Sequence, residues 1–174
     1  MIISFTGFMG CGKSSVGRRL SELLCYPFID LDDAIVEREG RSIPDIFATD
    51  GEQAFRKMEM EALKGIVHTS MEAQSPTLIL ALGGGAVMTP ECAQIVHEQT
   101  FCIYLRASIE TLMEHLSAEA EGRPLLQGEA LLERITKLME LRSETYEKTA
   151  HMIIDIDGMT IEEISQEIYI CQTK

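Results

Sequence analysis

Residues 7–14 read Gly7-Phe8-Met9-Gly10-Cys11-Gly12-Lys13-Ser14, which matches the pattern G-x-x-x-x-G-K-[ST]. The apolar run Met1 to Phe5 before it predicts a buried strand, and the amphipathic run Lys13 to Leu24 after it predicts a helix. The glycines allow a tight turn whose N–H groups form a phosphate cradle at the positive end of that helix. Lys13 then reaches the β- and γ-phosphates of a nucleotide, and Ser14 can bind Mg²⁺. The alternative is a chance glycine-rich turn, which the flanking strand and helix disfavour.

The composition is that of one folded domain. The chain has 174 residues, of which 45% are hydrophobic, enough for one core and short for two. Its longest apolar runs, such as Leu78 to Leu82, are too short to cross a bilayer, and no signal-peptide pattern opens the chain. Five cysteines without a C-x-x-C pair indicate reduced residues. We expect a single domain, residues 1–174, that is cytoplasmic and has no membrane partner.

The charge of the chain is strongly negative. The net charge of −13 argues against a nucleic-acid partner, because phosphate backbones are bound by excess Lys and Arg. An anionic ligand must therefore meet local positive charge. With only 15 Lys and Arg residues in the chain, those in unusual positions are informative.

Strand and helix patterns alternate along the whole chain. After the first strand and helix, we expect strands at Pro27–Leu31, Thr77–Leu82, Phe101–Leu105 and Met152–Ile156. Helices are expected at Asp33–Glu39, twice within residues 40–68, at Pro90–Glu98, at Ser108–Leu116, after residue 128 and at Ile161–Tyr169. This alternation predicts an α/β fold with a parallel sheet.

Acidic residues end the second expected strand. Asp30 and Asp32 would project from the same side of a strand, at the edge where open parallel sheets bind ligands. A carboxylate there can bind Mg²⁺, directly or through water, or accept a hydroxyl proton. Alternatively, one of these acids caps the helix Asp33–Glu39. Three acids within four residues allow both roles.

Two further stretches carry charge or glycine where a core residue is expected. Gly83-Gly84-Gly85 ends a buried strand, which favours a ligand against bare backbone over an ordinary turn. Arg142 continues an apolar stripe made of Leu131, Ile135 and Leu138. Its charge needs an anionic ligand or a core acid as partner, unless the side chain snorkels to solvent.

Residues 118–128 form a hydrophilic break that contains one arginine, Arg123. The break predicts either a mobile lid that closes on phosphate or a plain surface loop. Arg56 and Glu59 stand three apart on an expected helix, a spacing that more often gives an exposed ion pair than a site. Phe47 and Phe55 are by pattern core residues.

Taken together, these residues resemble the shikimate kinase family, nearly from end to end. The resemblance rests on the order and spacing of Gly7–Ser14, Asp30-Leu31-Asp32, Gly40-Arg41-Ser42-Ile43 with Ile46-Phe47, Phe55-Arg56 with Glu59, Gly83–Gly85, Arg123-Pro124-Leu125-Leu126, and Arg142 with Tyr146. It implies a three-layer α/β/α P-loop kinase fold with a five-stranded parallel sheet, a helical substrate-binding insertion at about residues 32–68 and a mobile lid at about residues 118–128.

The resemblance also implies an activity, transfer of the γ-phosphate of ATP to the 3-hydroxyl of shikimate. The products would be shikimate 3-phosphate and ADP, within the shikimate pathway of aromatic amino acid (chorismate) biosynthesis. The partners would be shikimate and ATP, with Mg²⁺ as the cofactor, and a kinase of this type is expected to be a monomer.

The resemblance further assigns a role to each matching residue. Catalysis would involve Lys13, Asp32, which would orient and deprotonate the shikimate hydroxyl, and Arg123 from the lid. ATP would be bound by Gly10, Cys11, Gly12, Lys13, Ser14, Ser15 and Arg123. Mg²⁺ would be held by Ser14 and Asp30, and shikimate by Asp32, Arg56, Gly84 and Arg142, with Glu59 bracing the site and Phe47 and Phe55 lining it.

One departure from the family and two alternative functions remain. Family members often carry basic residues late in the helix before the lid, where this chain has Met113-Glu114-His115, so nucleotide selectivity is open. A P-loop kinase of another metabolite, such as gluconate or a nucleoside monophosphate, would require new roles for Arg56 and Arg142. A nucleotide-dependent switch would be expected to carry an N-K-x-D motif, which the chain lacks.

Overall fold

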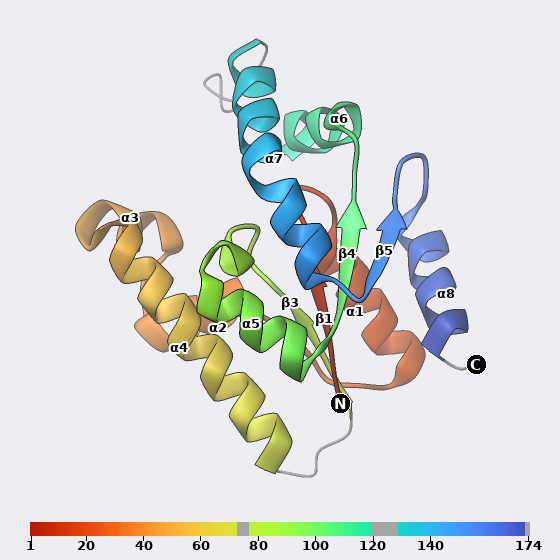
Figure 1. The fold of residues 1–174 in the computed structure, drawn as a ribbon, viewed down its shortest axis with the longest axis horizontal. Helices are drawn as coiled ribbons and strands as arrows, with labels where there is room; N and C mark the ends of the chain where they lie inside the picture. The colour runs from red at the N-terminus through yellow and green to blue at the C-terminus, as the bar shows by residue number, and fades with distance from the viewer. Residues whose placement is uncertain (73–76, 120–128, 173–174) are drawn as a thin grey trace.

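The computed structural model describes residues 1–72, 77–119 and 129–172, and a five-stranded sheet forms its centre (Figure 1). Every pair of neighbouring strands is parallel, in the order β2-β3-β1-β4-β5. The strands are β1 (Ile2–Thr6), β2 (Phe28–Asp30), β3 (Leu78–Ala81), β4 (Phe101–Arg106) and β5 (Met152–Asp155). The α/β fold with a five-stranded parallel sheet is therefore confirmed.

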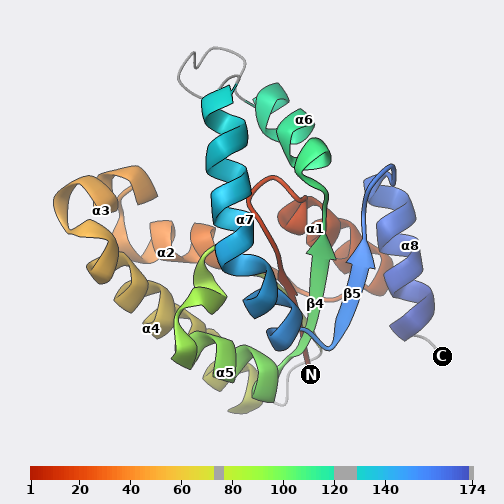
Figure 2. The same cartoon turned by 45° about the horizontal axis from the view of Figure 1, so that its top comes forward.

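Helices connect the strands and cover both faces of the sheet. They are α1 (Lys13–Leu24), α2 (Leu31–Glu39), α3 (Ile43–Thr49), α4 (Gly51–Glu72), α5 (Pro90–Gln99), α6 (Ile109–Glu119), α7 (Glu129–Thr149), α8 (Ile161–Gln172) and the short 3₁₀ helix η1 (Ala86–Met88). In Figures 1 and 2, α2, α3 and α4 lie together on one side of the molecule, away from α8.

Two apolar cores lie on opposite faces of the sheet. Successive residues of β3 alternate between them, so Leu80 packs on the face covered by α4 and α5, and Ile79 on the face covered by α1 and α8. This alternation explains why the strands read as continuous aliphatic runs, since both faces must be apolar. Helix α7 joins both cores, with Ile135 in the second and Tyr146 in the first.

The register of the strands brings three chain segments to one edge of the sheet. Phe5 of β1 pairs with Ala81 of β3, and Asp30 of β2 pairs with the same Ala81. The three strands therefore end at about the same level, and the turns that follow them meet. Because β1 lies between β3 and β4, its turn sits where successive crossovers diverge, the usual ligand position in open α/β sheets.

The junction after β2 differs from the strand and helix bounds expected from the sequence. Strand β2 ends at Asp30 and α2 begins at Leu31, so Asp32 lies in the first turn of a helix and strand alternation does not apply. The Oδ1 atom of Asp30 accepts hydrogen bonds from the backbone N–H groups of Asp32 (3.0 Å) and Asp33 (3.4 Å). Asp30 is therefore the N-cap of α2, which starts two residues before the expected Asp33.

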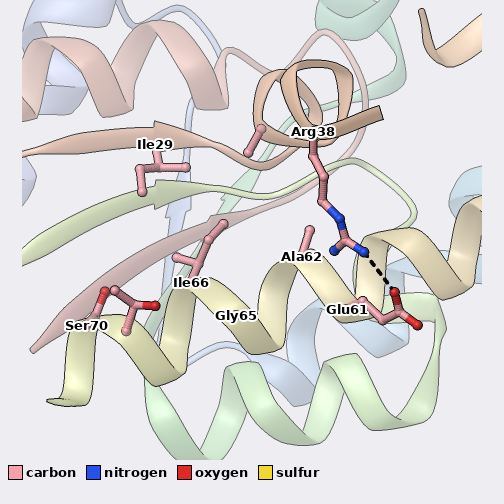
Figure 3. A pocket seen from close by; sticks show the side chains of 9 residues that line it. Ile29, Arg38, Glu61, Ala62, Gly65, Ile66 and Ser70 are labelled. Atoms are coloured by element: carbon pink, nitrogen blue, oxygen red, sulfur yellow. Dashed lines mark hydrogen bonds and ion pairs between the residues drawn. The ribbon is translucent and has the colours of Figure 1, made fainter. Parts of the chain in front are cut away.

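Two helical glycines provide a matched test of how tightly α1 packs on the sheet. A Cβ at Gly17 would lie 2.6 Å from Cε2 of Phe28, whereas a Cβ at Gly65 would meet nothing within 4 Å. Gly65 borders an open hollow between β2, α2 and α4 (Figure 3).

We predict that Gly17→Ala lowers the free energy of unfolding by about 1 to 2 kcal/mol, because overpacking outweighs the gain in helix propensity. Gly65→Ala should raise it by about 0.5 to 1 kcal/mol, since only the propensity changes. Urea unfolding of both variants measures the difference. Equal effects of the two substitutions would contradict the close packing of α1 on β2.

Candidate active site

The loop after β1 turns through three glycines with positive φ. Gly7, Gly10 and Gly12 have φ values of 142°, 77° and 88°, a region that other residues rarely adopt. At Gly7 a side chain is also excluded by space, because a Cβ would lie 2.8 Å from the carbonyl oxygen of Leu105. Gly12 is the N-cap residue of α1. The loop thus ends on the positive end of this helix, where anions bind.

Lys13 is buried inside this loop, with 8% of its surface exposed. Its ammonium group donates hydrogen bonds to the carbonyl oxygens of Gly7 (3.0 Å) and Phe8 (2.9 Å). A buried ammonium group needs such acceptors, because its loss of hydration is costly. The positive charge is therefore held within the loop, next to the N-terminus of α1.

The side-chain oxygens of Ser14 and Asp30 lie side by side, where α1 begins and β2 ends. The hydroxyl of Ser14 donates to Oδ2 of Asp30 at 2.5 Å, while Oδ1 of the same carboxylate caps α2. Hydroxyl and carboxylate oxygens are the ligands that Mg²⁺ prefers, usually with several waters kept. The pair therefore fits that ion, although the described residues contain no cluster of three or more His, Cys, Asp or Glu suited to a metal.

The first glycine after β3 lies against two carboxylates. A Cβ at Gly83 would be 2.8 Å from Oδ1 of Asp32 and 2.9 Å from Oε1 of Glu59. Any side chain here would displace one of these acids, which come from α2 and α4. The glycine thus lets two carboxylates from different helices approach the end of β3.

The next two glycines make room for the loop and for an arginine. A Cβ at Gly84 would lie 3.1 Å from the backbone nitrogen of Met9, and one at Gly85 would lie 2.4 Å from Nη2 of Arg56. The turn after β3 is therefore in close contact with the turn after β1. Groups of the protein itself thus approach these glycines closely, while all three glycines of this turn also line the cavity described below.

Arg56 and Glu59 form a partly buried ion pair. Nη1 of Arg56 donates to Oε2 of Glu59 at 2.7 Å, and the Glu59 side chain is 1% exposed. The other oxygen, Oε1, is buried and has no hydrogen-bond partner among the described residues. Burial raises the pKa of Glu59, and the nearby Asp32 carboxylate raises it further, while Arg56 opposes both. The simple exposed ion pair that spacing alone favours is not what the structure contains.

Asp32 lies between negative and positive groups. Burial raises the pKa of its carboxyl above the ordinary value, and the Asp30 carboxylate adds to this rise. Lys13 and Arg56 act in the opposite direction. A carboxylate in such surroundings is a stronger base than an exposed one, so it is suited to accepting a proton.

Arg142 and Tyr146 of α7 converge on one backbone carbonyl of the glycine turn. The hydroxyl of Tyr146 donates to the Gly84 oxygen at 2.5 Å, and Nη1 of Arg142 lies 3.4 Å from the same atom. The Arg142 guanidinium also lies 5.9 Å from the ring centroid of Phe8. Among the described residues, no acid lies within ion-pair distance of Arg142, although its charge lowers the pKa of the buried Glu59 carboxyl at longer range.

Several of the groups described above line one cavity of about 630 Å³, which we call the acceptor cavity. It is lined by all the residues expected to contact an acceptor, namely Asp32, Phe47, Phe55, Arg56, Glu59, Gly84 and Arg142. The rings of Phe47 and Phe55 lie 4.7 Å apart at one wall. Phe55 is also a core residue, as its pattern indicated, whereas Phe47 is 38% exposed.

Other lining residues of this acceptor cavity were missed by the sequence analysis. They are Met9, Ile43, Glu52, Arg134, Lys137 and Leu138. For Arg134 a signal existed, since it precedes Arg142 by eight residues and therefore shares its helix face. Arg123 lies outside the described residues, as does most of the expected lid.

His115 of α6 contacts the loop from its other side. Its Nδ1 lies 2.7 Å from the carbonyl oxygen of Gly10, so this nitrogen carries a proton and donates. Leu116 packs next to it, 3.0 Å from where a Gly10 side chain would start. The segment Met113-Glu114-His115, which departs from the family in charge, thus touches the loop backbone.

A parallel sheet whose first strand leads through this glycine-rich loop into a helix defines a P-loop nucleotide-binding protein of the kinase type. A sequence model of the shikimate kinase family matches residues 9–172. The shikimate kinase of one Thermus thermophilus strain is 45% identical over 166 residues, covering 95% of this chain and 86% of the relative. That of Dictyoglomus turgidum is 41% identical, covering 95% and 94%. The chain therefore belongs to the shikimate kinase family.

Solved structures agree with this assignment. The shikimate kinase from Acinetobacter baumannii in complex with shikimate is 31% identical, with a TM-score of 0.85 and coverage of 99% of this chain and 94% of that one. The enzyme from Aquifex aeolicus is 32% identical, with a TM-score of 0.79 and coverage of 99% and 96%. No helix in the described part of this chain combines the length and hydropathy needed to cross a membrane.

We predict that Tyr146→Phe lowers the free energy of unfolding by about 1 to 2 kcal/mol, because the partly buried Gly84 carbonyl loses the hydrogen bond from the buried Tyr146 side chain. Tyr104→Phe is the matched control. The Tyr104 ring packs 5.2 Å from that of Tyr146, but its hydroxyl makes no hydrogen bond to another described residue. Its loss should cost under about 0.5 kcal/mol. Urea unfolding distinguishes the two, and equal costs would contradict the role of the Gly84 contact.

Proposed function

We propose that the chain is a shikimate kinase that transfers the γ-phosphate of ATP to the 3-hydroxyl of shikimate, within aromatic amino acid biosynthesis. The observation that carries this proposal is the cavity in which Asp32 and the cations of Arg56 and Arg142 line the space beside the phosphate loop. A small hydroxy acid has the two groups that these side chains recognise. Membership of the family supports the same assignment.

The nucleotide side of the site consists of the loop after β1. We assign phosphate binding to the backbone of Gly10, Cys11 and Gly12, to Lys13, and to the first turn of α1 with Ser14 and Ser15. The ammonium group of Lys13, now bound to two loop carbonyls, would exchange these for phosphate oxygens. Ser14 and Asp30 would hold Mg²⁺, Asp30 through water, and the ion would neutralise charge on the phosphates.

The acceptor side of the site is built to receive a carboxylate. Arg56 and Arg142 would bind it, together with the backbone at Gly84, because guanidinium groups suit carboxylates in both charge and geometry. Glu59 holds Arg56 in place at 2.7 Å. Its Oε1, which has no hydrogen-bond partner among the described residues, would accept a hydrogen bond from a hydroxyl of the ligand. Phe47 and Phe55 would form the apolar wall.

The chemical step would depend on positioning and on charge. Asp32 would orient the attacking hydroxyl and accept its proton, because it lies in the cavity and its pKa is raised. Lys13 would offset negative charge on the transferring phosphoryl group. Arg123, which lies outside the described residues, would add a second positive charge from the lid at about residues 118–128, and closure would exclude water.

We also propose how the chain is organised and where it works. Residues 1–174 would form one kinase domain, in which the helices within about residues 32–68 are the acceptor-binding insertion. The free buried thiols of Cys11, Cys92 and Cys102 suit a reducing cytoplasm. The net charge of −13 argues against a nucleic-acid partner. We also propose that the enzyme works as a monomer.

The first prediction from this proposal is that shikimate stimulates ADP release from Mg-ATP strongly. Quinate and gluconate, tested in parallel, should give little stimulation, because they present their hydroxyls differently to Asp32 and the two arginines. A coupled ADP assay measures all three. Stimulation by gluconate alone would indicate a related kinase, and slow hydrolysis without any acceptor effect would indicate a nucleotide switch.

The second prediction concerns the pH dependence of turnover. Asp32 accepts a proton only as a carboxylate, and its pKa is raised. Activity should therefore fall on acidification at a pH above the ordinary pKa of an aspartate, about 3.9. Arg56→Gln should move this acid limb to higher pH, because Arg56 lowers the pKa of Asp32.

Asp32→Asn should lose about 100-fold or more in kcat while still binding shikimate in calorimetry. Unchanged turnover of Asp32→Asn would remove Asp32 from the mechanism.

A further inference from the structure

Most arginine and lysine side chains in the described ranges bond to a carboxylate or a carbonyl. Examples are Arg19 with Glu162 at 2.6 Å and Arg41 with Asp50 at 2.5 Å. Even in the apolar hollow of Figure 3, Arg38 is paired with Glu61 at 3.0 Å.

The cations without such a partner in the described part of the chain lie on two helices. They are Lys57 and Lys64 on α4 and Arg134 and Lys137 on α7, all of them exposed. The other nine cations of the described residues each bond to a carboxylate or a carbonyl. Two of the four that do not, Arg134 and Lys137, stand three residues apart on α7.

Arg134 and Lys137 share one location that the other two lack. Both line the acceptor cavity, together with Arg56 and Arg142, whereas Lys57 and Lys64 do not. Their spacing of three residues places them on the same side of α7. The cavity lining thus holds four cations against the three acids Asp32, Glu52 and Glu59, although the whole chain has a net charge of −13.

We propose that Arg134 and Lys137 are a capture pair, which attracts the acceptor's carboxylate and guides it toward Arg56 and Arg142. The proposal rests on the proposed function, because it assigns these residues to the same small hydroxy-acid anion. It adds two positioning residues to the acceptor site, neither of which touches the reacting atoms.

The physical need for such a pair follows from the charge of the molecule. An anion that approaches a protein of net charge −13 is repelled at long range, and local cations at the entrance reverse this field. Exposed charges act over roughly one Debye length, about 8 Å at physiological salt. Charges at the rim of a site change association rate and salt dependence, whereas paired charges within it determine the bound complex. The capture pair should therefore affect kcat/KM more than kcat.

The test uses a double variant that carries both Arg134→Gln and Lys137→Gln. Its ADP release in the presence of shikimate is compared with that of the unaltered protein. We expect kcat/KM for shikimate to fall about 3- to 10-fold at low salt, with kcat within about twofold and KM for ATP unchanged. The difference should shrink as KCl is raised toward about 0.5 M, because salt screens exposed charges. Calorimetric titration with shikimate should show the same loss of affinity.

Two control variants separate capture from a general effect. The double variant Lys57→Gln with Lys64→Gln removes the same two charges from α4 outside the cavity, and it should leave kcat/KM and its salt dependence unchanged. A second control variant, which carries Arg134→Lys and Lys137→Arg, keeps both charges. Its kcat/KM for shikimate should stay close to that of the unaltered protein. A role that depended on the shape of the two side chains would instead be lost.

Several results would overturn the inference. An unchanged kcat/KM for shikimate, a difference that persists at high salt, or a rise in the KM for ATP alone would each exclude a capture pair for the acceptor. If the unaltered protein does not consume shikimate at all, the proposed function fails first. If it does and the double variant behaves identically, only the capture pair fails.

Discussion

The contact between the turn after β3 and the loop after β1 is the constraint on which the rest of the site depends. A Cβ at Gly84 would lie 3.1 Å from the backbone nitrogen of Met9, so the two turns meet without an intervening side chain. Their strands are neighbours in the sheet, which brings them into range. The hydroxyl of Tyr146 then ties the Gly84 carbonyl to α7. The loop after β1 and the cavity that we assign to the acceptor therefore share a wall, as transfer between two bound molecules would require.

Electrostatics inside the site follow from the same close approach. Asp32 and Glu59 come from different helices, yet both lie against Gly83, and burial raises the pKa of each. The positive charge of Arg56 opposes this rise in pKa through its ion pair with Glu59, whose side chain is 1% exposed. Removing one member of such a pair would leave an uncompensated buried charge. The cluster thus holds a carboxylate and a cation in fixed positions inside a protein whose net charge is −13.

Much of this could be predicted from local patterns. The buried strands were found because both faces of the sheet are apolar, so β3 reads as a continuous aliphatic run. The junction after β2 was placed wrongly, because the capping bonds of Asp30 start α2 earlier than hydrophobic periodicity indicates. Arg134 and Lys137 were missed, since an exposed cation on a helix looks the same whether it faces solvent or a cavity.

The sequence by itself determined the order of elements, the phosphate loop and the family, because these depend on neighbouring residues and on spacing along one chain. The tertiary structure alone decided what the glycines at 83–85 accommodate and which cations line the acceptor cavity. It also decided that Glu59 is buried, with one oxygen that bonds to no other described residue. These features arise where α2, α4, α7 and two turns meet across long sequence separations. No local sequence pattern predicts these contacts, because the packing of the helices on the sheet sets the distances between their side chains.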